Sequence, residues 1–355
     1  MKTIKIKFCD FWKHWNQQDN FIVNILKKRY NIEFSDNPDY VFFSNFNEDF
    51  EHMDYNNCVK IFYTQENLVP DFNYADYGIG FDDIIYGDRY IRYPIYLIPE
   101  RYGRFWNLMK RKHLFENSEE VLDRGFCSFV VSNGNADEIR NNAFEALNKY
   151  KEIHSGGRYK NNIGLPDGVL DKLEFASKYK FSLCFENTSH PGYSTEKIIE
   201  AFAAKTIPIY WGDPNITDIF NPKSFIDVTS CKTIEEIVQK VKEVDSDDGL
   251  YLKMLGTKAL NEQSELYYEE AQQKLEKFLY NIFEQEPQDA LRRNLFFWGA
   301  EYHKRYFSMR KVYLLWKYSI VNRVGVVLRS IKTTIKKICG KMSNSVLGKN
   351  VNKKN

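Results

Sequence analysis

The hydrophobic pattern between residues 181 and 214 constrains the fold of this chain more than any other part of the sequence. Residues 181–185 (FSLCF) form a short β-prone run, and Pro191 and Gly192 punctuate the polar stretch that follows. From Ser194 onward, apolar residues recur at helical spacing. Residues 207–211 (IPIYW) return to a β-prone pattern. The segment therefore predicts a strand, a loop, a helix and a second strand, which is the repeating unit of a parallel α/β sheet.

Polar side chains gather at one end of this unit, where the first strand ends and the helix begins. Ligands of open α/β sheets bind beyond the carboxyl ends of the strands. The start of a helix also offers free N–H groups and a positive dipole end to a phosphate. The sequence therefore predicts an anionic ligand at this corner. The candidate binding residues are Asn187, Tyr193, Ser194, Thr195, Glu196 and Lys197.

The motifs CFEN, GYSTEKI and IPIYWG, in this order, resemble the donor-binding motif of the α1,3/4-fucosyltransferases of glycosyltransferase family 10, especially the bacterial ones. The resemblance covers residues 40–225 well and the flanks loosely. It implies the GT-B arrangement, in which two Rossmann-like domains face a central cleft, whereas the residues alone indicate only an α/β chain of about two domains. We expect an acceptor domain over residues 1–124, a GDP-fucose domain over residues 125–301 and a basic tail over residues 302–355.

The family implies an inverting transfer of L-fucose from GDP-fucose to a glycan hydroxyl, which needs a carboxylate base opposite the leaving group. Glu66 lies in VKIFYTQENLVPDFN, which resembles the family segment that carries the proposed base. The local sequence alone favours a solvated loop glutamate, and the resemblance reverses that preference. Glu196 is the second acidic candidate. It either binds ribose or fucose hydroxyls or supports charge that develops on the sugar.

Three basic residues are candidates for neutralising the diphosphate. Lys197 occupies the first turn of the predicted helix, where a cation is unfavourable unless an anion binds. The loop HSGGRYKNNIG supplies Arg158 and Lys160. Bacterial relatives have an arginine where this chain has Lys160, but we favour Arg158 because a guanidinium can hold a phosphate through two hydrogen bonds.

The segment SNGNADEIRNNAF follows the β-prone residues 126–132 and also resembles a family motif, with one additional residue. Asn133 lies at the end of the predicted strand and is a candidate for donor binding. Arg140 lies in the next predicted helix. Two interpretations of Arg140 stay open, a contact with the donor and a salt bridge to a helix neighbour.

Aromatic residues follow the first predicted strand in the segment FCDFWKHWN. Relatives carry a tryptophan-containing loop there, so Trp12, His14 and Trp15 are candidates for acceptor binding. They form either a sugar-stacking surface or a partly buried aromatic cluster. The resemblance implies that the acceptor is an N-acetyllactosamine-type surface glycan, linked α1,3 through its N-acetylglucosamine unit.

The sequence predicts neither a metal site nor a cofactor beyond the GDP-fucose donor. Asp82-Asp83 and residues 245–248 are the acidic clusters that evoke a metal–diphosphate bridge, but the second lies between helical segments, as a solvated turn does. The six histidines show no metal-ligand spacing. Neither a GxGxxG nor a Walker sequence occurs. We expect that a divalent metal stimulates the reaction at most and is not essential.

Cysteine usage and the N-terminus indicate a cytoplasmic location. None of the six cysteines forms a CxxC pair, and three lie in strand-like runs, which is typical of reduced, buried thiols. The N-terminus lacks the apolar core of a signal peptide. No run approaches the roughly 18 apolar residues of a membrane-spanning helix.

Charge is distributed unevenly along the chain. The 54 residues after Glu301 hold 14 basic and no acidic residues, whereas residues 1–301 hold 36 basic and 48 acidic residues. Over residues 320–341, apolar side chains recur every three or four positions opposite basic ones, which predicts a basic amphipathic helix. A membrane surface, packing on the protein and a nucleic-acid arm stay open as its partner. The missing acidic residues and the basic tails of relatives favour an anionic membrane at its inner face, and not a nucleic acid.

Two other functions compete with fucose transfer. One is a GT-B glycosyltransferase that uses another nucleotide sugar, which a panel of donors would separate. The other is a catalytically inactive carbohydrate-binding or membrane-adaptor protein. The presence of Glu66 and of the complete Thr195-Glu196-Lys197 corner argues against inactivity.

Overall fold

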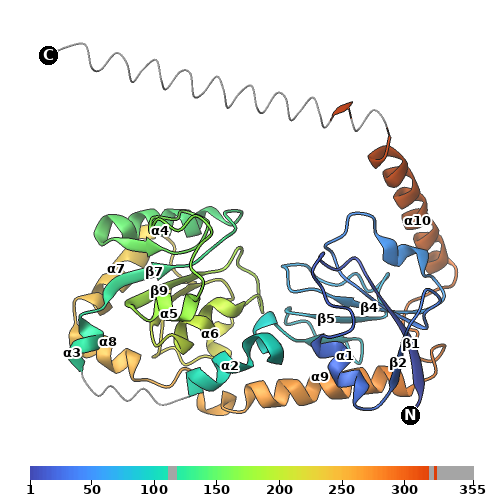
Figure 1. Ribbon diagram of the computed structural model, residues 1–355, viewed down its shortest axis with the longest axis horizontal. Coiled ribbons are helices and arrows are strands. Elements are labelled where there is room, and N and C mark those ends of the chain that lie inside the picture. The colour runs from blue at the N-terminus through green and yellow to red at the C-terminus, as the bar shows by residue number, and fades with distance from the viewer. Residues whose placement is uncertain (111–117, 320–323, 326–355) are drawn as a thin grey trace.

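The computed structural model describes residues 1–110, 118–319 and 324–325, and it contains two parallel β-sheets flanked by helices (Figure 1). The first sheet has the strand order β2-β1-β3-β4-β5-β6, and all of its pairs are parallel. β3, β4 and β5 are buried along their whole length, as strands covered on both faces are. The strands are β1 (Thr3–Cys9), β2 (Asn31–Phe34), β3 (Tyr40–Phe43), β4 (Val59–Tyr63), β5 (Tyr77–Gly80) and β6 (Tyr90–Arg92).

Short helices connect these strands and lead into the second half of the molecule. They are α1 (Phe21–Lys27), η1 (Glu51–Asp54), η2 (Ile95–Leu97), α2 (Pro99–Lys110) and α3 (Ser118–Leu122). Asn20 caps α1 by accepting a hydrogen bond from the Val23 backbone N–H at 3.1 Å. The apolar side of α1, including Ile22 and Leu26, is then buried in the core of the first half.

The second sheet has the strand order β11-β10-β9-β7-β8, and its pairs are again parallel. It contains the unit predicted from residues 181–214, because β9 and β10 pair side by side and α6 connects them. The strands are β7 (Gly125–Phe129), β8 (Ile153–Ser155), β9 (Tyr179–Phe185), β10 (Ile207–Trp211) and β11 (Ile226–Asp227). The helices are α4 (Glu138–Tyr150), α5 (Lys172–Ala176), α6 (Glu196–Ala203), η3 (Ile216–Asp218), α7 (Ile234–Asp245), α8 (Asp248–Leu255) and η4 (Glu262–Ser264).

Helix α9 (Tyr267–Glu284) returns from the second half and runs beneath the first (Figure 1). Its buried residues Leu275, Leu279 and Phe283 belong to the same core as β1, β3 and β4. The rings of Phe283 and Tyr40 lie 4.3 Å apart between centroids. The two halves therefore share a helix that belongs by sequence to the second. The domain limits expected at residues 124 and 301 stay predictions.

Helix α10 (Trp298–Lys317) packs at the edge of the first half. The ring of His303 stacks on Tyr74 at 5.0 Å, and Arg310 forms an ion pair with Asp54. The predicted amphipathic helix over residues 320–341 lies outside the described residues, apart from residues 324–325. Among the helices that the structure describes, none combines the length and apolar character that a bilayer crossing requires.

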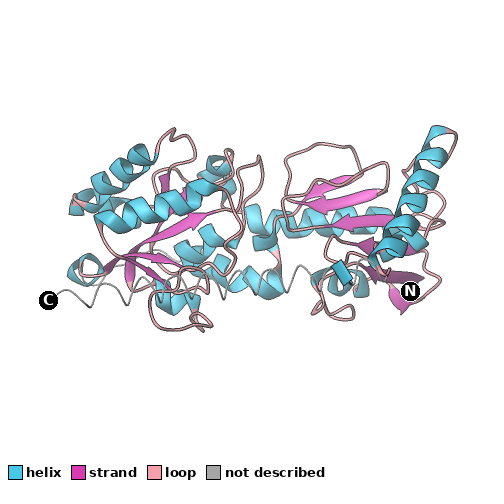
Figure 2. Cartoon of the chain, turned by 90° about the horizontal axis from the view of Figure 1, so that it is seen from above, coloured by secondary structure: helices cyan, strands magenta, loops and turns pink. Residues whose placement is uncertain are grey.

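The expected α/β fold with two Rossmann-like halves is confirmed. Figure 2 shows the two sheet-and-helix halves side by side. Three strands, β1, β4 and β9, are followed by the loops that carry the predicted acceptor, base and donor residues. A cavity between the halves brings these loops together.

Candidate active site

A cavity of about 490 Å³ lies between the two halves and receives side chains from both. Most of the predicted site residues line this cavity. The sequence predicted the residues of each segment separately, but it could not show that the segments meet at one cavity. From the first half these are Trp12, Trp15 and Glu66, and from the second half Asn187, Tyr193, Thr195, Glu196 and Lys197. His14, Asn133, Arg158, Lys160 and Ser194 do not line the cavity.

The candidate residues Asn187 and 193–197, where the loop after β9 leads into α6, are named the donor corner. Glu186 positions them from inside the protein. It is fully buried at the end of β9. Its carboxylate accepts hydrogen bonds from the Thr195 backbone N–H and the Thr195 hydroxyl, both at 2.7 Å, and from Lys197 Nζ at 2.8 Å. Burial alone would lower the pKa of Lys197, but Glu186 and Glu196 raise it above its ordinary value. Lys197 is therefore a cation of the cavity lining, and its ammonium group is held in place by Glu186.

Glu196 opens α6 and lines the cavity beside Lys197. Burial opposes its ionisation, but the charges of Lys197 and Lys172 hold the pKa of its carboxyl below its ordinary value. Glu200, one turn further along α6, has a raised pKa because of burial, an effect that neighbouring Glu196 adds to. The pKa values of these two neighbouring carboxyls are therefore shifted in opposite directions, and the ionised form is favoured at Glu196, the one that lines the cavity.

Arg140 lies directly behind the donor corner. It is fully buried, and it donates hydrogen bonds to Asn187 Oδ1 at 2.8 Å and to the Asn133 carbonyl at 2.6 Å. Its Nε has no hydrogen-bond partner, and no ion pair joins it to a carboxylate within the described residues. Burial lowers the pKa of Arg140. Within the described residues no salt bridge joins Arg140 to a helix neighbour, which was one of the two interpretations left open by the sequence, and the contact with the donor stays a prediction. The charge of Glu186 partly offsets the effect of burial on Arg140.

The other predicted cationic residues lie away from the cavity. Arg158 is exposed, and Lys160 forms an ion pair with Glu145. The Oδ1 of Asn133 accepts a hydrogen bond from the Asn135 backbone N–H, so this side chain shapes its own loop. Roles for these residues in donor binding stay predictions.

Glu66 is exposed at the cavity, in the loop that follows β4. Its backbone N–H donates to the Thr64 hydroxyl at 3.1 Å, and the neighbouring Gln65 donates to the Tyr93 carbonyl at 3.2 Å. The loop is therefore anchored directly before Glu66, while the side chain of Glu66 stays exposed at the cavity.

The structure places two of the acceptor candidates, Trp12 and Trp15, in an aromatic cluster at the cavity, and a sugar-stacking role for them stays a prediction. Trp12 and Trp15 are half-buried and lie 4.7 Å apart, edge to face, and Trp15 also stacks on Phe11 at 4.7 Å. They belong to an aromatic cluster, and they also line the cavity. His14 is exposed and does not contribute to the lining.

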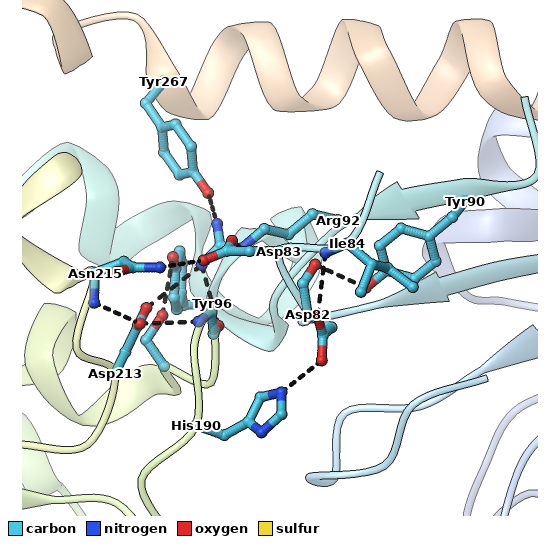
Figure 3. A network of polar contacts seen from close by, with 12 residues as sticks. Asp82, Asp83, Ile84, Tyr90, Arg92, Tyr96, His190, Asp213, Asn215 and Tyr267 are labelled. Atoms are coloured by element: carbon cyan, nitrogen blue, oxygen red, sulfur yellow. Dashed lines mark hydrogen bonds and ion pairs between the residues drawn. The ribbon is translucent and has the colours of Figure 1, made fainter. Parts of the chain in front are cut away.

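The acidic clusters considered for a metal serve other contacts. Asp82 pairs with His190 at 2.6 Å and Asp83 with Arg92 at 2.7 Å (Figure 3). Asp245 accepts from Tyr150 and Lys151. No group of three or more metal-ligating side chains occurs within the described residues.

Sequence reasoning missed several residues of the site. The sequence analysis does not single out Glu186 from the polar stretch after residue 185. Its position directly after an apolar strand is a signal that could have identified it as a site residue. Asp19, Glu100 and Arg101 also line the cavity, and no local pattern distinguishes them from surface residues.

Two family models match the chain. The N-terminal domain of Alpha-(1,3)-fucosyltransferase FucT matches residues 6–99, and the C-terminal domain of glycosyltransferase family 10 (fucosyltransferase) matches residues 123–280. The Alpha-(1,3)-fucosyltransferase FucT of Helicobacter pylori is 37% identical over 292 residues, which cover 73% of this chain and 60% of that protein. A 4-galactosyl-N-acetylglucosaminide 3-alpha-L-fucosyltransferase 9 of Bos taurus is 35% identical over 128 residues, 35% of this chain and 34% of that protein. The chain thus spans 60% and 34% of the length of these two curated relatives, in each case less than two thirds.

Solved structures are similar over a larger share of their length. A crystal structure of alpha1,3-fucosyltransferase with GDP-fucose has 32% sequence identity and a TM-score of 0.64, and the match covers 79% of this chain and 91% of that one. Another crystal structure of alpha1,3-fucosyltransferase has 33% identity and a TM-score of 0.66 over the same shares. The similarity therefore includes both halves of the fold.

Proposed function

This chain belongs to the fucosyltransferases of glycosyltransferase family 10, and we propose that it transfers L-fucose from GDP-fucose to a hydroxyl of an N-acetylglucosamine-containing glycan. We further propose an α1,3 linkage and inversion at the sugar carbon. The observation that carries this proposal is that one cavity is lined by Glu66 of the first half and by Asn187, Tyr193 and Lys197 of the second. A direct displacement needs a base and a cationic corner at the same cavity, and these residues supply both.

The donor corner supplies positive charge for the diphosphate. Lys197 lines the cavity with an ammonium group that Glu186 orients, and behind it Arg140 adds a buried charge that forms no ion pair within the part of the chain that the structure describes. Fixed charges of this kind stabilise the negative charge that develops on the leaving GDP, because they need no reorganisation during the reaction. No step of this proposal needs a metal ion, so turnover should persist after chelation with EDTA.

The chemical step is a displacement with Glu66 as the base. Its carboxylate takes the proton of the acceptor hydroxyl while that oxygen forms a bond to C1 of fucose. The bond from C1 to the β-phosphate oxygen breaks, and GDP leaves with the electron pair. Glu196 either holds the sugar hydroxyls or supports positive charge on the sugar ring, and its lowered pKa suits both roles.

The acceptor enters from the aromatic side of the cavity in this proposal. Trp12 and Trp15 offer ring surfaces on which the apolar face of a sugar can stack, in front of Glu66. The supporting observation is that both rings contribute to the lining while their other sides are packed in the aromatic cluster. An N-acetyllactosamine-type glycan is the acceptor that this arrangement and the family suggest.

A peripheral membrane location is also a proposal. The 14 basic and no acidic residues after Glu301, and the amphipathic pattern over residues 320–341, support an anionic membrane surface as the partner.

A donor panel tests the proposed function. The purified chain is incubated with N-acetyllactosamine and GDP-fucose, GDP-mannose or UDP-galactose, and the product linkage is assigned by NMR. We expect turnover with GDP-fucose alone and a fucose linked α1,3 to N-acetylglucosamine. Preference for another donor would support the alternative nucleotide-sugar transferase. Absence of turnover with every donor, despite GDP binding, would contradict the transferase proposal.

A further inference from the structure

The loop that connects β9 to α6, residues 186–195 and here named the donor loop, divides its residues between two surfaces. Asn187, Tyr193 and Thr195 line the cavity. Thr188, His190, Gly192 and Ser194, at alternate positions, form hydrogen bonds or ion pairs with the first half of the molecule. The ring of Tyr193 also packs on Phe81 of the first half, with 4.9 Å between centroids. The donor loop is therefore in contact with both the cavity and the first half.

Each of these four contacts crosses from one half to the other. Thr188 accepts a hydrogen bond from Asn67, which follows Glu66, and His190 Nε2 lies 2.6 Å from Asp82 Oδ2. The Ser194 hydroxyl donates to the Tyr96 hydroxyl at 3.3 Å. Four successive contacts along so short a segment hold the donor loop against the first half more firmly than one isolated bond would.

Arg92 is the centre of this arrangement, because it binds Gly192 and three other groups at once. Figure 3 shows Arg92 beside Tyr267, Asp83 and Asp213. At the end of β6, Arg92 donates to the Gly192 carbonyl at 3.1 Å and to the Tyr267 hydroxyl of α9 at 2.7 Å. Its Nε lies 2.7 Å from Asp83 Oδ1, and its NH2 lies 3.7 Å from Asp213 Oδ2. One guanidinium thus connects the first half, the donor loop, the loop after β10 and α9.

Gly192 fits this place only because it lacks a side chain. Its φ of +82° is in the left-handed region, and a Cβ there would lie 2.5 Å from the Phe81 carbonyl oxygen. Its N–H donates to Asp213 Oδ1 at 2.8 Å. Both peptide groups around Gly192 are therefore fixed, one by Arg92 and one by Asp213.

We propose that Arg92 is a positioning residue for donor binding: it holds Gly192, and through it Tyr193 and Thr195, in the binding conformation. The affinity for the donor then depends on contact between the two halves and not on the second half alone. This inference rests on the proposed function, since it takes the donor loop to bind a guanosine diphosphate sugar. A displacement of Tyr193 by about 1 Å is enough to weaken a pre-organised site substantially.

Arg92→Met tests the inference, with Arg89→Met as the matched control. Arg89 donates to the carbonyls of Phe72, Ala75 and Asp76, all within the first half. We expect Arg92→Met to weaken GDP binding in calorimetry by about 10-fold or more and to raise the KM for GDP-fucose equally, while kcat changes by less than about 3-fold. Arg89→Met should lower the melting temperature without changing GDP affinity.

Gly192→Ala provides a second perturbation that changes no charge. It should also raise the KM for GDP-fucose, because the added Cβ pushes the donor loop away from Phe81. Normal GDP affinity in either Arg92→Met or Gly192→Ala, measured on folded protein, would overturn the inference. If Arg92→Met does not fold, the result for Gly192→Ala decides. A wild-type chain that binds no GDP and does not turn over GDP-fucose would contradict the proposed function itself.

Discussion

Lys197 Nζ lies 2.8 Å from Oε2 of Glu186, a carboxylate that has no exposure to solvent. The cation of the donor corner is therefore one half of a buried ion pair before any ligand arrives. A buried pair contributes little net stability, but removal of one partner leaves the other charge buried and unpaired. Substitutions of Lys197 consequently act on stability as well as on ligand binding.

Lys197→Ala should therefore weaken GDP binding and also lower the free energy of unfolding by about 3–5 kcal/mol, since Glu186 loses its counter-charge. The double variant Glu186→Gln, Lys197→Ala removes both charges. It should recover most of the stability but none of the affinity. Urea unfolding and calorimetry with GDP on the same preparations measure the two effects. Recovery of GDP affinity in the double variant would exclude a direct role for Lys197.

Arg140→Met should weaken GDP binding more than Arg158→Met or Lys160→Met. Arg140 donates a hydrogen bond to Asn187 and forms no ion pair among the described residues, whereas Arg158 is exposed and Lys160 is paired with Glu145. Loss of a hydrogen-bonded charge costs about 1.5–3 kcal/mol, or roughly 10- to 100-fold in affinity. Calorimetry with GDP on the three variants ranks them. A larger loss for Arg158→Met would restore the preference drawn from sequence.

Lys60→Met should stabilise the protein. Lys60 is fully buried in β4, its Nζ has no hydrogen-bond partner and lies 4.2 Å from the Tyr74 ring centroid, and burial and Arg293 lower its pKa to about 7. Methionine avoids the cost of burying this amine, so the variant should be more stable at pH 7 by about 1–4 kcal/mol.

The pH dependence of that difference follows from the lowered pKa of Lys60. Between pH 7 and the ordinary lysine pKa of 10.5, the unfolded chain binds more protons than the folded one, so wild-type stability rises with pH. The advantage of Lys60→Met should therefore stay constant below pH 7 and shrink by about 1 kcal/mol per pH unit above it. Urea unfolding at pH 6, 7 and 9 measures this. An equal difference at all three values would show that Lys60 is not titrating as described.

Removal of residues 320–355 should leave a folded enzyme with normal turnover on a small acceptor, because α10 and both sheets precede the deletion. Sedimentation with anionic liposomes should be lost, and in the full-length chain it should weaken at high salt, since salt screens the basic face. Neutral liposomes are the control. Undiminished liposome binding after truncation would contradict a membrane role for the tail, and a large fall in melting temperature would indicate that the tail packs on the protein.

Local sequence patterns predicted the helices and strands of the fold better than they predicted which elements pack against each other. The unit from β9 to β10 was predicted with its loop and helix because alternation between apolar runs and turn residues is a local signal. The buried residues of α9 recur at helical spacing, but periodicity does not indicate that the helix packs on Tyr40 and Phe42 in the opposite half. Short strands such as β2 and β8 carry too few residues for a pattern.

Site residues that belong to a sequence motif could be predicted. Site residues whose role depends on burial in the folded protein could not. Glu66, Asn187 and Lys197 were found through motifs, and the structure brings them to one cavity. Arg140 and Glu186 act through burial and through hydrogen bonds across loops, which depend on tertiary contacts. For the same reason the sequence could not distinguish a surface lysine from the buried amine of Lys60.

The turnover of Glu66→Gln, measured beside its affinity for GDP, tests the central claim most directly. Glutamine keeps the shape of the side chain but cannot accept the acceptor proton, so kcat should fall by about 10²–10⁴-fold while GDP affinity stays within about 3-fold. Glu100→Gln removes another carboxylate of the same cavity and should cost less than about 10-fold in kcat. Near wild-type turnover of Glu66→Gln with N-acetyllactosamine and GDP-fucose would contradict base catalysis by Glu66, and with it the mechanism proposed for this cavity.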